Sequence, residues 1–199
     1  MIRFIRESDY PQVLRVWQAC FGDDEEYIRF FWENGFPVCR GLCLEADGQT
    51  VSMLFLLPCA LAYKMTYLPA EYVYAVATLP EHRGRGYAAQ LTREAAAIAV
   101  SEGKSALCLR PGDEGLYDYY GKLGFVKAFA RHERENRRGS FAWSAPVEAY
   151  IRKESELTDR ALSYRPMESP GGMLLPLERR AEQWLRKTKG RAYMGPALE

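Results

Sequence analysis

The stretch from residue 72 to residue 129 alternates between short β-rich runs and longer runs whose apolar residues recur at helical spacing. This alternation restricts the fold more than any other feature of the sequence. Two strands of one sheet that are joined through a helix usually lie parallel, so the pattern predicts at least one parallel pair. The expected strands are 72–79, 105–109 and 125–129, and the expected helices are 88–103 and 114–123.

The first 63 residues predict a different arrangement, in which two helices precede an antiparallel hairpin. Asp47-Gly48 lies between two β-rich runs, and this dipeptide is a strong hairpin signal. A hairpin beside a parallel pair indicates a mixed α/β sheet. The expected elements are a strand at 1–6, a helix that Ser8 or Asp9 caps and that runs to about Cys20, an aromatic-rich helix that Asp23 and Asp24 open, and strands Val38–Ala46 and Thr50–Tyr63.

Composition excludes several classes of protein. The chain has 199 residues, 48% of them hydrophobic, and is long enough to bury a core without disulfides. Its formal net charge of +1 lacks the basic excess of a nucleic-acid-binding domain. The longest apolar run, Val51–Ala62, is interrupted by Ser52 and Pro58 and is too short for a membrane span. We therefore expect a cytoplasmic protein that binds neither nucleic acid nor a membrane.

The cysteines and histidines do not indicate a metal site. The five cysteines include no C-x-x-C pair, and the two histidines stand alone. We expect the cysteines to behave as small buried hydrophobic residues.

A glycine-rich turn joins the expected strand 72–79 to the helix that follows, in the segment YVYAVATLPEHRGRGYAAQL. Gly84 and Gly86 lack side chains, which allows a ligand to come close to the backbone. The first turn of the helix presents unpaired N–H groups and the positive end of the helix dipole, and together these form an anion site suited to phosphates. Arg83 and Arg85 add positive charge beside it.

Two phosphate-binding interpretations fit this turn. Gly84-x-Gly86-x-x-Ala89 matches the dinucleotide fingerprint G-x-G-x-x-A, but the residues TLPEHR separate it from the strand, and no acid follows at the tip of a second strand. The other interpretation is R-x-x-G-x-A, formed by Arg83, Gly86 and Ala88. A P-loop is excluded because no G-K-[ST] follows.

The R-x-x-G-x-A pattern resembles the pyrophosphate-binding turn of the GNAT (Gcn5-related N-acetyltransferase) superfamily, which binds acetyl-CoA. A second segment, LYDYYGKLGF, resembles the helix of that family that ends in Tyr-x-x-x-Gly-Phe, with Tyr120, Gly124 and Phe125 at the matching positions. The sequences YGKLGF and YVYAVAT are similar to those of the enhanced-intracellular-survival branch of the family, whose members are much longer.

The resemblance covers residues 1–130 and implies the GNAT fold. That fold is α/β, a mixed, mostly antiparallel twisted sheet with helices on both faces and splayed central strands. On this basis residues 1–130 form a catalytic core that binds acetyl-CoA. Residues 131–199 form a structured C-terminal extension packed on the core, where substrate choice or the contacts of a homodimer would reside.

The resemblance also implies roles for individual residues. Tyr120 corresponds to the acid that protonates the departing thiolate, although the sequence alone does not separate it from Tyr117 or Tyr119. The base is left open among Glu71 and Glu81, which lie near the relevant strand and turn, a water relay, and the terminal residue Glu199. In the enhanced-survival relatives the C-terminal carboxylate of the chain is the base, which implies the same role for Glu199 here. The implied cofactor-binding residues are Val76, Ala77, Thr78, Arg83, Gly84, Arg85, Gly86, Tyr87 and Ala88.

The leading hypothesis is an N-acetyltransferase that transfers an acetyl group from acetyl-CoA to a primary amine of a small molecule or peptide. Two alternatives are a CoA-binding regulatory or interaction module without catalysis, and an oxidoreductase that binds a nucleotide cofactor through the G-x-G-x-x-A turn. The acceptor amine is not identified by the sequence, because the balanced charge favours neither a cationic nor an anionic substrate.

Overall fold

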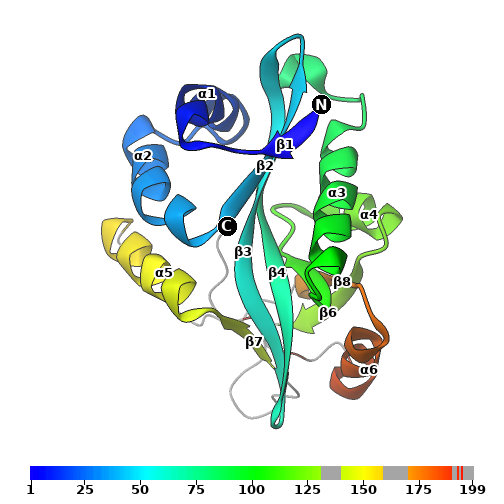
Figure 1. Cartoon of the computed structure of the whole chain (residues 1–199). Helices are drawn as coiled ribbons and strands as arrows, with labels where there is room; N and C mark the ends of the chain where they lie inside the picture. The colour runs from blue at the N-terminus through cyan, green and yellow to red at the C-terminus, as the bar shows by residue number, and fades with distance from the viewer. Residues whose placement is uncertain (131–139, 159–169, 190–191, 193, 195–199) are drawn as a thin grey trace. The chain divides into compact units, whose positions relative to one another are not determined.

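The computed structural model describes residues 1–130, 140–158, 170–189, 192 and 194 (Figure 1). The α-helices are α1 (Tyr10–Phe21), α2 (Glu25–Asn34), α3 (Tyr87–Ser101), α4 (Glu114–Lys122), α5 (Ala145–Leu157) and α6 (Arg179–Thr188). The strands are β1 (Ile2–Phe4), β2 (Arg40–Ala46), β3 (Gln49–Tyr63), β4 (Thr66–Thr78), β5 (Ala106–Leu109), β6 (Val126–Ala130), β7 (Ser140–Trp143) and β8 (Pro170–Pro176). None of the helices in the described part of the chain is long and apolar enough to cross a membrane.

The strands form one open sheet in the order β1-β2-β3-β4-β5-β8-β6, and β7 pairs with β3. Strands β4 and β5 are parallel, with Ala70 opposite Ala106 and Tyr72 opposite Cys108. The pairs β1–β2, β2–β3, β3–β7, β5–β8 and β6–β8 are antiparallel. This arrangement confirms the predicted mixed, mostly antiparallel α/β fold and its parallel pair.

Local signals account for the elements of the N-terminal region. The Asp24 side chain accepts a hydrogen bond from the Tyr27 N–H at 2.7 Å and so caps α2, while Gly22, with a φ angle of 74°, ends α1. The turn at Asp47-Gly48 has positive φ angles at both residues, 51° and 73°, as a two-residue hairpin turn requires.

The structure contains three stretches of β-strand that the sequence did not predict. Strand β4 begins at Thr66, six residues before the expected start, because Lys64 adopts a φ angle of 54° and closes a second hairpin with β3. Lysine gives no turn signal, so the pattern did not indicate this hairpin. Strands β7 and β8 were also not predicted. The Gly-rich sequence PGGMLLP reads as a loop, yet it forms β8 because neighbours on both sides supply its hydrogen bonds.

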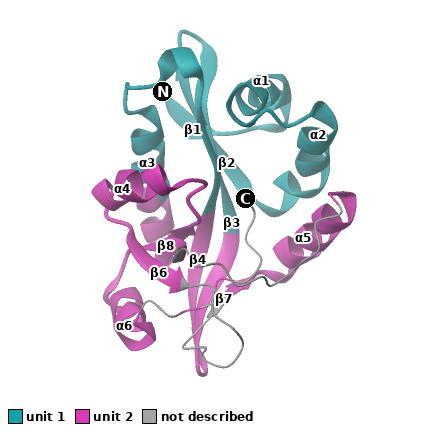
Figure 2. Ribbon diagram, turned by 180° about the vertical axis from the view of Figure 1, so that it is seen from behind, with its two compact units in different colours: residues 1–57, 73–95 teal, residues 58–72, 96–199 magenta. Residues whose placement is uncertain are grey.

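The chain separates into two compact units, which Figure 2 shows in different colours. Unit 1 consists of residues 1–57 and 73–95. Within it, α1 and α2 lie on one side of the strands and the start of α3 lies on the other (Figure 2). Trp17 of α1 is the centre of an aromatic cluster, with ring centroids 4.9 Å from Phe31, 5.7 Å from Phe55 and 5.9 Å from Tyr74.

Unit 2 consists of residues 58–72 and 96–199. Its core joins early and late parts of the chain: Phe129 lies 5.7 Å from Trp184 between ring centroids, and the Trp184 indole donates a hydrogen bond to the Ala62 carbonyl at 3.2 Å. Strand β8 is an interior strand between β5 and β6, so the last third of the chain contributes directly to the sheet. The division into a core and an extension at residue 130 stays a prediction.

Candidate functional site

The turn between β4 and α3 places two glycines in the left-handed backbone region. Gly84 and Gly86 have φ angles of 77° and 75°, and a Cβ built on either one meets no heavy atom within 4 Å. This conformation costs a residue with a side chain about 1–2 kcal/mol. Both glycines therefore serve the backbone conformation of the turn, and the space beside them is open.

The amides after this turn precede the helical hydrogen bonds of α3. The Gln90 N–H donates to the Gly86 carbonyl at 3.0 Å. The N–H groups of Tyr87, Ala88 and Ala89 therefore lie in the first turn, where a helix supplies no acceptor four residues earlier. With the positive end of the helix dipole, they form the kind of anion site that binds a phosphate group.

Hydrogen bonds from three elements fix the end of β4. The Thr78 carbonyl accepts from the Cys20 thiol at 3.3 Å and from Arg83 Nε at 3.2 Å. The Ser52 hydroxyl donates to the Ala77 carbonyl at 2.7 Å and lies 2.8 Å from the Thr78 hydroxyl. No sequence pattern indicated Cys20 or Ser52, because these contacts join residues 25 to 58 positions apart.

Ala75 interrupts the regular geometry of β4 directly before Val76. Its φ angle is 48°, whereas strand residues have φ angles of about −160° to −60°. The paired residues of β4 with β5 run from Ala70 to Tyr72, before this position. A left-handed residue within a strand changes the direction of the backbone groups next to it. This break could not be predicted from the sequence, since alanine does not favour a left-handed conformation.

Tyr120 lies in the last turns of α4 and is 6% exposed. Its carbonyl accepts hydrogen bonds from the Leu123 N–H at 2.9 Å and the Phe125 N–H at 3.1 Å, and Gly124 has a φ angle of 92°. These bonds explain the Tyr-x-x-x-Gly-Phe spacing as a helix end that turns back on Tyr120. Phe125 covers its ring, with centroids 5.5 Å apart.

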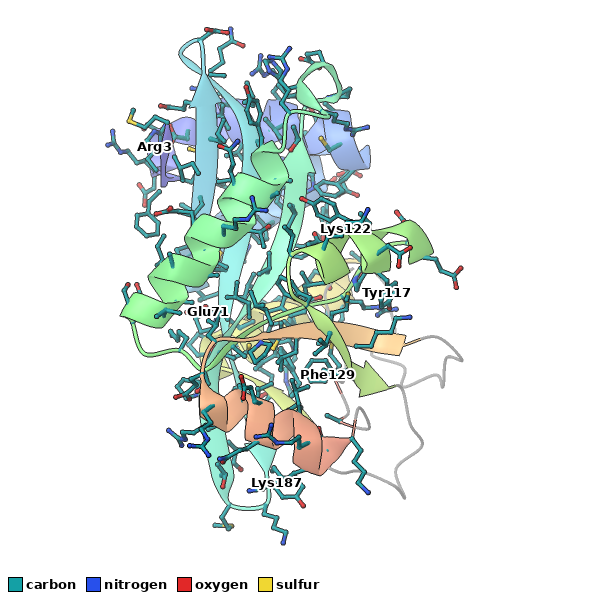
Figure 3. All side chains as sticks on the ribbon, turned by 90° about the vertical axis from the view of Figure 1, so that its right-hand side faces the viewer. Arg3, Glu71, Tyr117, Lys122, Phe129 and Lys187 are labelled. Carbon is teal, nitrogen blue, oxygen red and sulfur yellow. The ribbon has the colours of Figure 1, made fainter. Side chains whose placement is uncertain are left out.

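Burial separates Tyr120 from the other two tyrosines of α4. Tyr117 and Tyr119 are half-buried, and the Lys127 ammonium lies 5.2 Å from the centroid of the Tyr117 ring. Figure 3 shows Tyr117 on this helix. Burial, with a smaller contribution from Tyr119, raises the pKa of Tyr120 well above the ordinary value of a tyrosine. Its phenol therefore holds its proton throughout the neutral range.

Glu71, which is labelled in Figure 3, lies on β4 and is 2% exposed. It forms an ion pair with Lys104, with 2.8 Å between Nζ and Oε1. A buried carboxylate needs such a partner, since an isolated buried charge is very costly. Glu199, the other predicted base, lies outside the described residues. Neither role is tested by the geometry, and both stay predictions.

The predicted site residues are divided between the two units. Unit 1 brings together the turn and the end of β4, whereas Glu71 and Tyr120 belong to unit 2. Within unit 1, Ala77 is buried, the stretch 83–86 is exposed, and the remaining predicted cofactor residues are half-buried: Val76, Thr78, Tyr87 and Ala88.

The family model described as acetyltransferase (GNAT) domain matches residues 1–128. The fold and the turn thus belong to the acyltransferase class, and the chain is a member of the GNAT acetyltransferase family. This confirms the resemblance found in the R-x-x-G-x-A and Tyr-x-x-x-Gly-Phe segments. No protein with curated annotation matches the sequence.

Solved structures share the fold. The GNAT family N-acetyltransferase YhbS from Escherichia coli, in complex with CoA, has a TM-score of 0.61 and 17% identity over 98% of this chain and 87% of its own. A GNAT family acetyltransferase from Brucella melitensis, in complex with acetyl-CoA, has a TM-score of 0.56 and 22% identity over 73% and 96%. Eis1 from Mycobacterium abscessus has a TM-score of 0.56 and 17% identity over 64% and 32%. The chain thus spans about a third of the length of Eis1 and of other long structures that it matches.

Proposed function

We propose that the protein transfers the acetyl group of acetyl-CoA to a primary amine of a small molecule or peptide by direct attack of the amine. The observation that carries this proposal is the turn at Gly84 and Gly86, where exposed backbone and the first amides of α3 form an anion site in a chain of the GNAT family. The complexes of two similar folds with CoA and acetyl-CoA support acetyl-CoA as the donor.

The residues of the turn fit a pyrophosphate. Beside Gly84 and Gly86 no heavy atom lies within 4 Å of an added Cβ, so a phosphate meets no side chain there. The amides from Arg83 to Ala88 would bind its oxygens, and the exposed guanidinium of Arg85 would add a charge-assisted contact. The backbone of Val76, Ala77 and Thr78 would hold the pantetheine arm along the end of β4.

The chemistry demands four things of these groups. The amine nitrogen, in its neutral form, forms a bond to the acetyl carbon, and the bond from that carbon to sulfur breaks. We assign the polarisation of the carbonyl oxygen to the Val76 N–H, because the left-handed Ala75 changes the direction of the strand there. The leaving thiolate gains a proton, and the nitrogen loses one.

Tyr120 supplies the proton to the thiolate in this proposal. An acid must remain protonated until the leaving group departs, and a phenol meets this condition at neutral pH. Among the three tyrosines of α4, it is the buried one.

The proton of the amine passes to a carboxylate, either Glu71 or Glu199. Glu71 has a defined place on β4, where its carboxylate forms an ion pair with the Lys104 ammonium at 2.8 Å. We expect deletion of residues 195–199 to leave the rate of acetyl transfer unchanged, as measured by thiol release. A rate at least tenfold lower, with unchanged binding of acetyl-CoA, would identify the carboxylate of Glu199 as the base.

The activity is tested by two measurements. Thermal melting with acetyl-CoA, CoA and NAD(P)H should show stabilisation by the two CoA compounds alone, and stabilisation by NAD(P)H alone would refute the proposal. A screen of amines with a free-thiol reagent should then show CoA release that depends on the amine. If the protein binds acetyl-CoA but releases no CoA with any amine, it is a CoA-binding module without catalysis. A cytoplasmic location and a homodimer stay predictions.

A further inference from the structure

We propose that the acceptor is a primary amine carried on an apolar, aromatic body, and that two features of unit 1 recognise it. The hydroxyl pair of Tyr27 and Tyr74 would bind the amine end, and the exposed ring of Phe21 would contact the apolar body. The inference rests on the proposed acetyl transfer and adds the class of acceptor to it.

The hydroxyl pair joins α2 to β4 beside the break in that strand. The two hydroxyl oxygens are 3.2 Å apart, with Tyr74 6% exposed and Tyr27 half-buried. Tyr74 directly precedes Ala75 and is two residues before Val76, the proposed partner of the acetyl carbonyl. The attacking nitrogen must come within about 3–3.5 Å of the carbonyl carbon, so the acceptor must approach this short stretch of β4.

Phenolic oxygens suit the amine end of such an acceptor. A hydroxyl oxygen accepts hydrogen bonds from N–H groups and leaves the amine uncharged, whereas a carboxylate would favour the unreactive ammonium form. The carboxylate that touches this cluster, Asp23, already accepts a hydrogen bond from the Trp17 indole at 2.8 Å.

An exposed aromatic ring packs against the same cluster. Phe21, the last residue of α1, is 46% exposed, and its ring centroid lies 5.8 Å from that of Trp17. Trp17 in turn lies 5.9 Å from Tyr74. The Trp17 indole thus packs against both Tyr74 and Phe21. An aromatic body bound against Phe21 would remove apolar surface from water, which a short alkyl group would do far less.

The test compares 2-phenylethylamine with propylamine, two primary amines. Each kcat/KM is calculated on the concentration of the neutral amine, because 2-phenylethylamine is the weaker base. We expect the wild-type protein to show a kcat/KM at least tenfold higher for 2-phenylethylamine, measured by thiol release. Phe21→Ala should reduce this preference to about twofold, mainly through KM for the aromatic amine, and leave KM for acetyl-CoA unchanged. Tyr27→Phe should raise KM for both amines about fivefold, the effect of one lost hydrogen bond.

Phe4→Ala is the matched control, because Phe4 is also 46% exposed but lies on β1 and contacts Arg40. It should leave the preference unchanged. An equal rate for both amines in the wild type, or a preference that survives in Phe21→Ala, overturns the inference. Calorimetry with acetyl-CoA separates this failure from that of the proposed function: a protein that binds acetyl-CoA and acetylates propylamine equally well retains the function and lacks the aromatic preference.

Discussion

Two glycines with the same backbone geometry offer a controlled test of the anion site. Gly86 lies in the turn before α3 with a φ angle of 75°, and Gly22 ends α1 with a φ angle of 74°. A Cβ at either position meets no heavy atom within 4 Å. Alanine at each should therefore cost the same conformational energy, while only Gly86 lies where a phosphate is expected to bind.

The magnitude follows from the geometry. A side chain in the left-handed region costs about 1–2 kcal/mol, and 1 kcal/mol lowers Tm by about 2–4 °C in a chain of this size. Gly86→Ala and Gly22→Ala should thus lower Tm by similar amounts. The Cβ at Gly86 would also take space needed by the pyrophosphate and disturb its amide contacts. Losing one hydrogen bond to a charged group costs about 1.5–3 kcal/mol, which corresponds to a Kd about 10- to 100-fold higher.

The assay pairs thermal melting without ligand with calorimetric titration of CoA. The expected result is an equal loss of Tm in the two variants and a raised Kd in Gly86→Ala alone. An unchanged Kd in Gly86→Ala, or an equal rise in both variants, would show that CoA does not depend on the backbone of this turn.

Three further variants test other parts of the chain. Tyr120→Phe should lower kcat at least about 100-fold through loss of the acid, with Kd for acetyl-CoA within about twofold of wild type; an unchanged kcat in the thiol-release assay would remove Tyr120 from the mechanism. Lys104→Met removes the ammonium that pairs with the buried carboxylate of Glu71 at 2.8 Å, so we expect a loss of about 3 kcal/mol in the free energy of unfolding measured by urea denaturation; a loss below about 1 kcal/mol would show that the pair adds little to stability. Asp9→Asn removes a carboxylate that accepts from Arg3 at 2.6 Å and 3.0 Å and from the Arg6 N–H at 2.7 Å. The hydrogen bond from Arg3 is the main cause of the lowered pKa of Asp9, so its stabilising effect is present above the unfolded pKa of about 3.9 and is lost as the pH falls through the lower folded value. Urea unfolding should therefore show Asp9→Asn about 1–3 kcal/mol less stable at pH 7, with the difference shrinking below pH ~4, and a difference that does not change with pH would contradict this account.

The composition of the chain does not identify the acceptor amine, whereas the burial of its aromatic side chains bears on it. A net charge of +1 gave no preference among amines. The structure distinguishes the aromatic residues of α1 and α2 by burial: Trp17 and Phe31 are fully enclosed, while Phe21 remains 46% exposed. The exposed ring is where a bound amine would gain contact area.

Local sequence determined the elements whose signals lie within a few residues. Asp24 caps α2, Asp47-Gly48 forms the first hairpin turn, and Gly84 and Gly86 take the left-handed conformations that the turn before α3 needs. Each depends on backbone preferences of the residues themselves, so each was predictable. The same holds for Gly124, which permits the return of the backbone to Tyr120.

Only the tertiary structure decided the features that depend on distant partners. Residues 170–176 form an interior strand because they pair with β5 on one side and β6 on the other, although their own sequence is typical of a loop. Burial of Tyr120 beside Phe125, the ion pair of Glu71 with Lys104, and the left-handed Ala75 likewise arise from packing and long-range pairing. The sequence by itself therefore determined the family, the turn and the alternation of strands and helices. The raised pKa of Tyr120, the strand break at Ala75 and the exposure of Phe21 required the fold, because each is set by packing against residues that are remote along the chain.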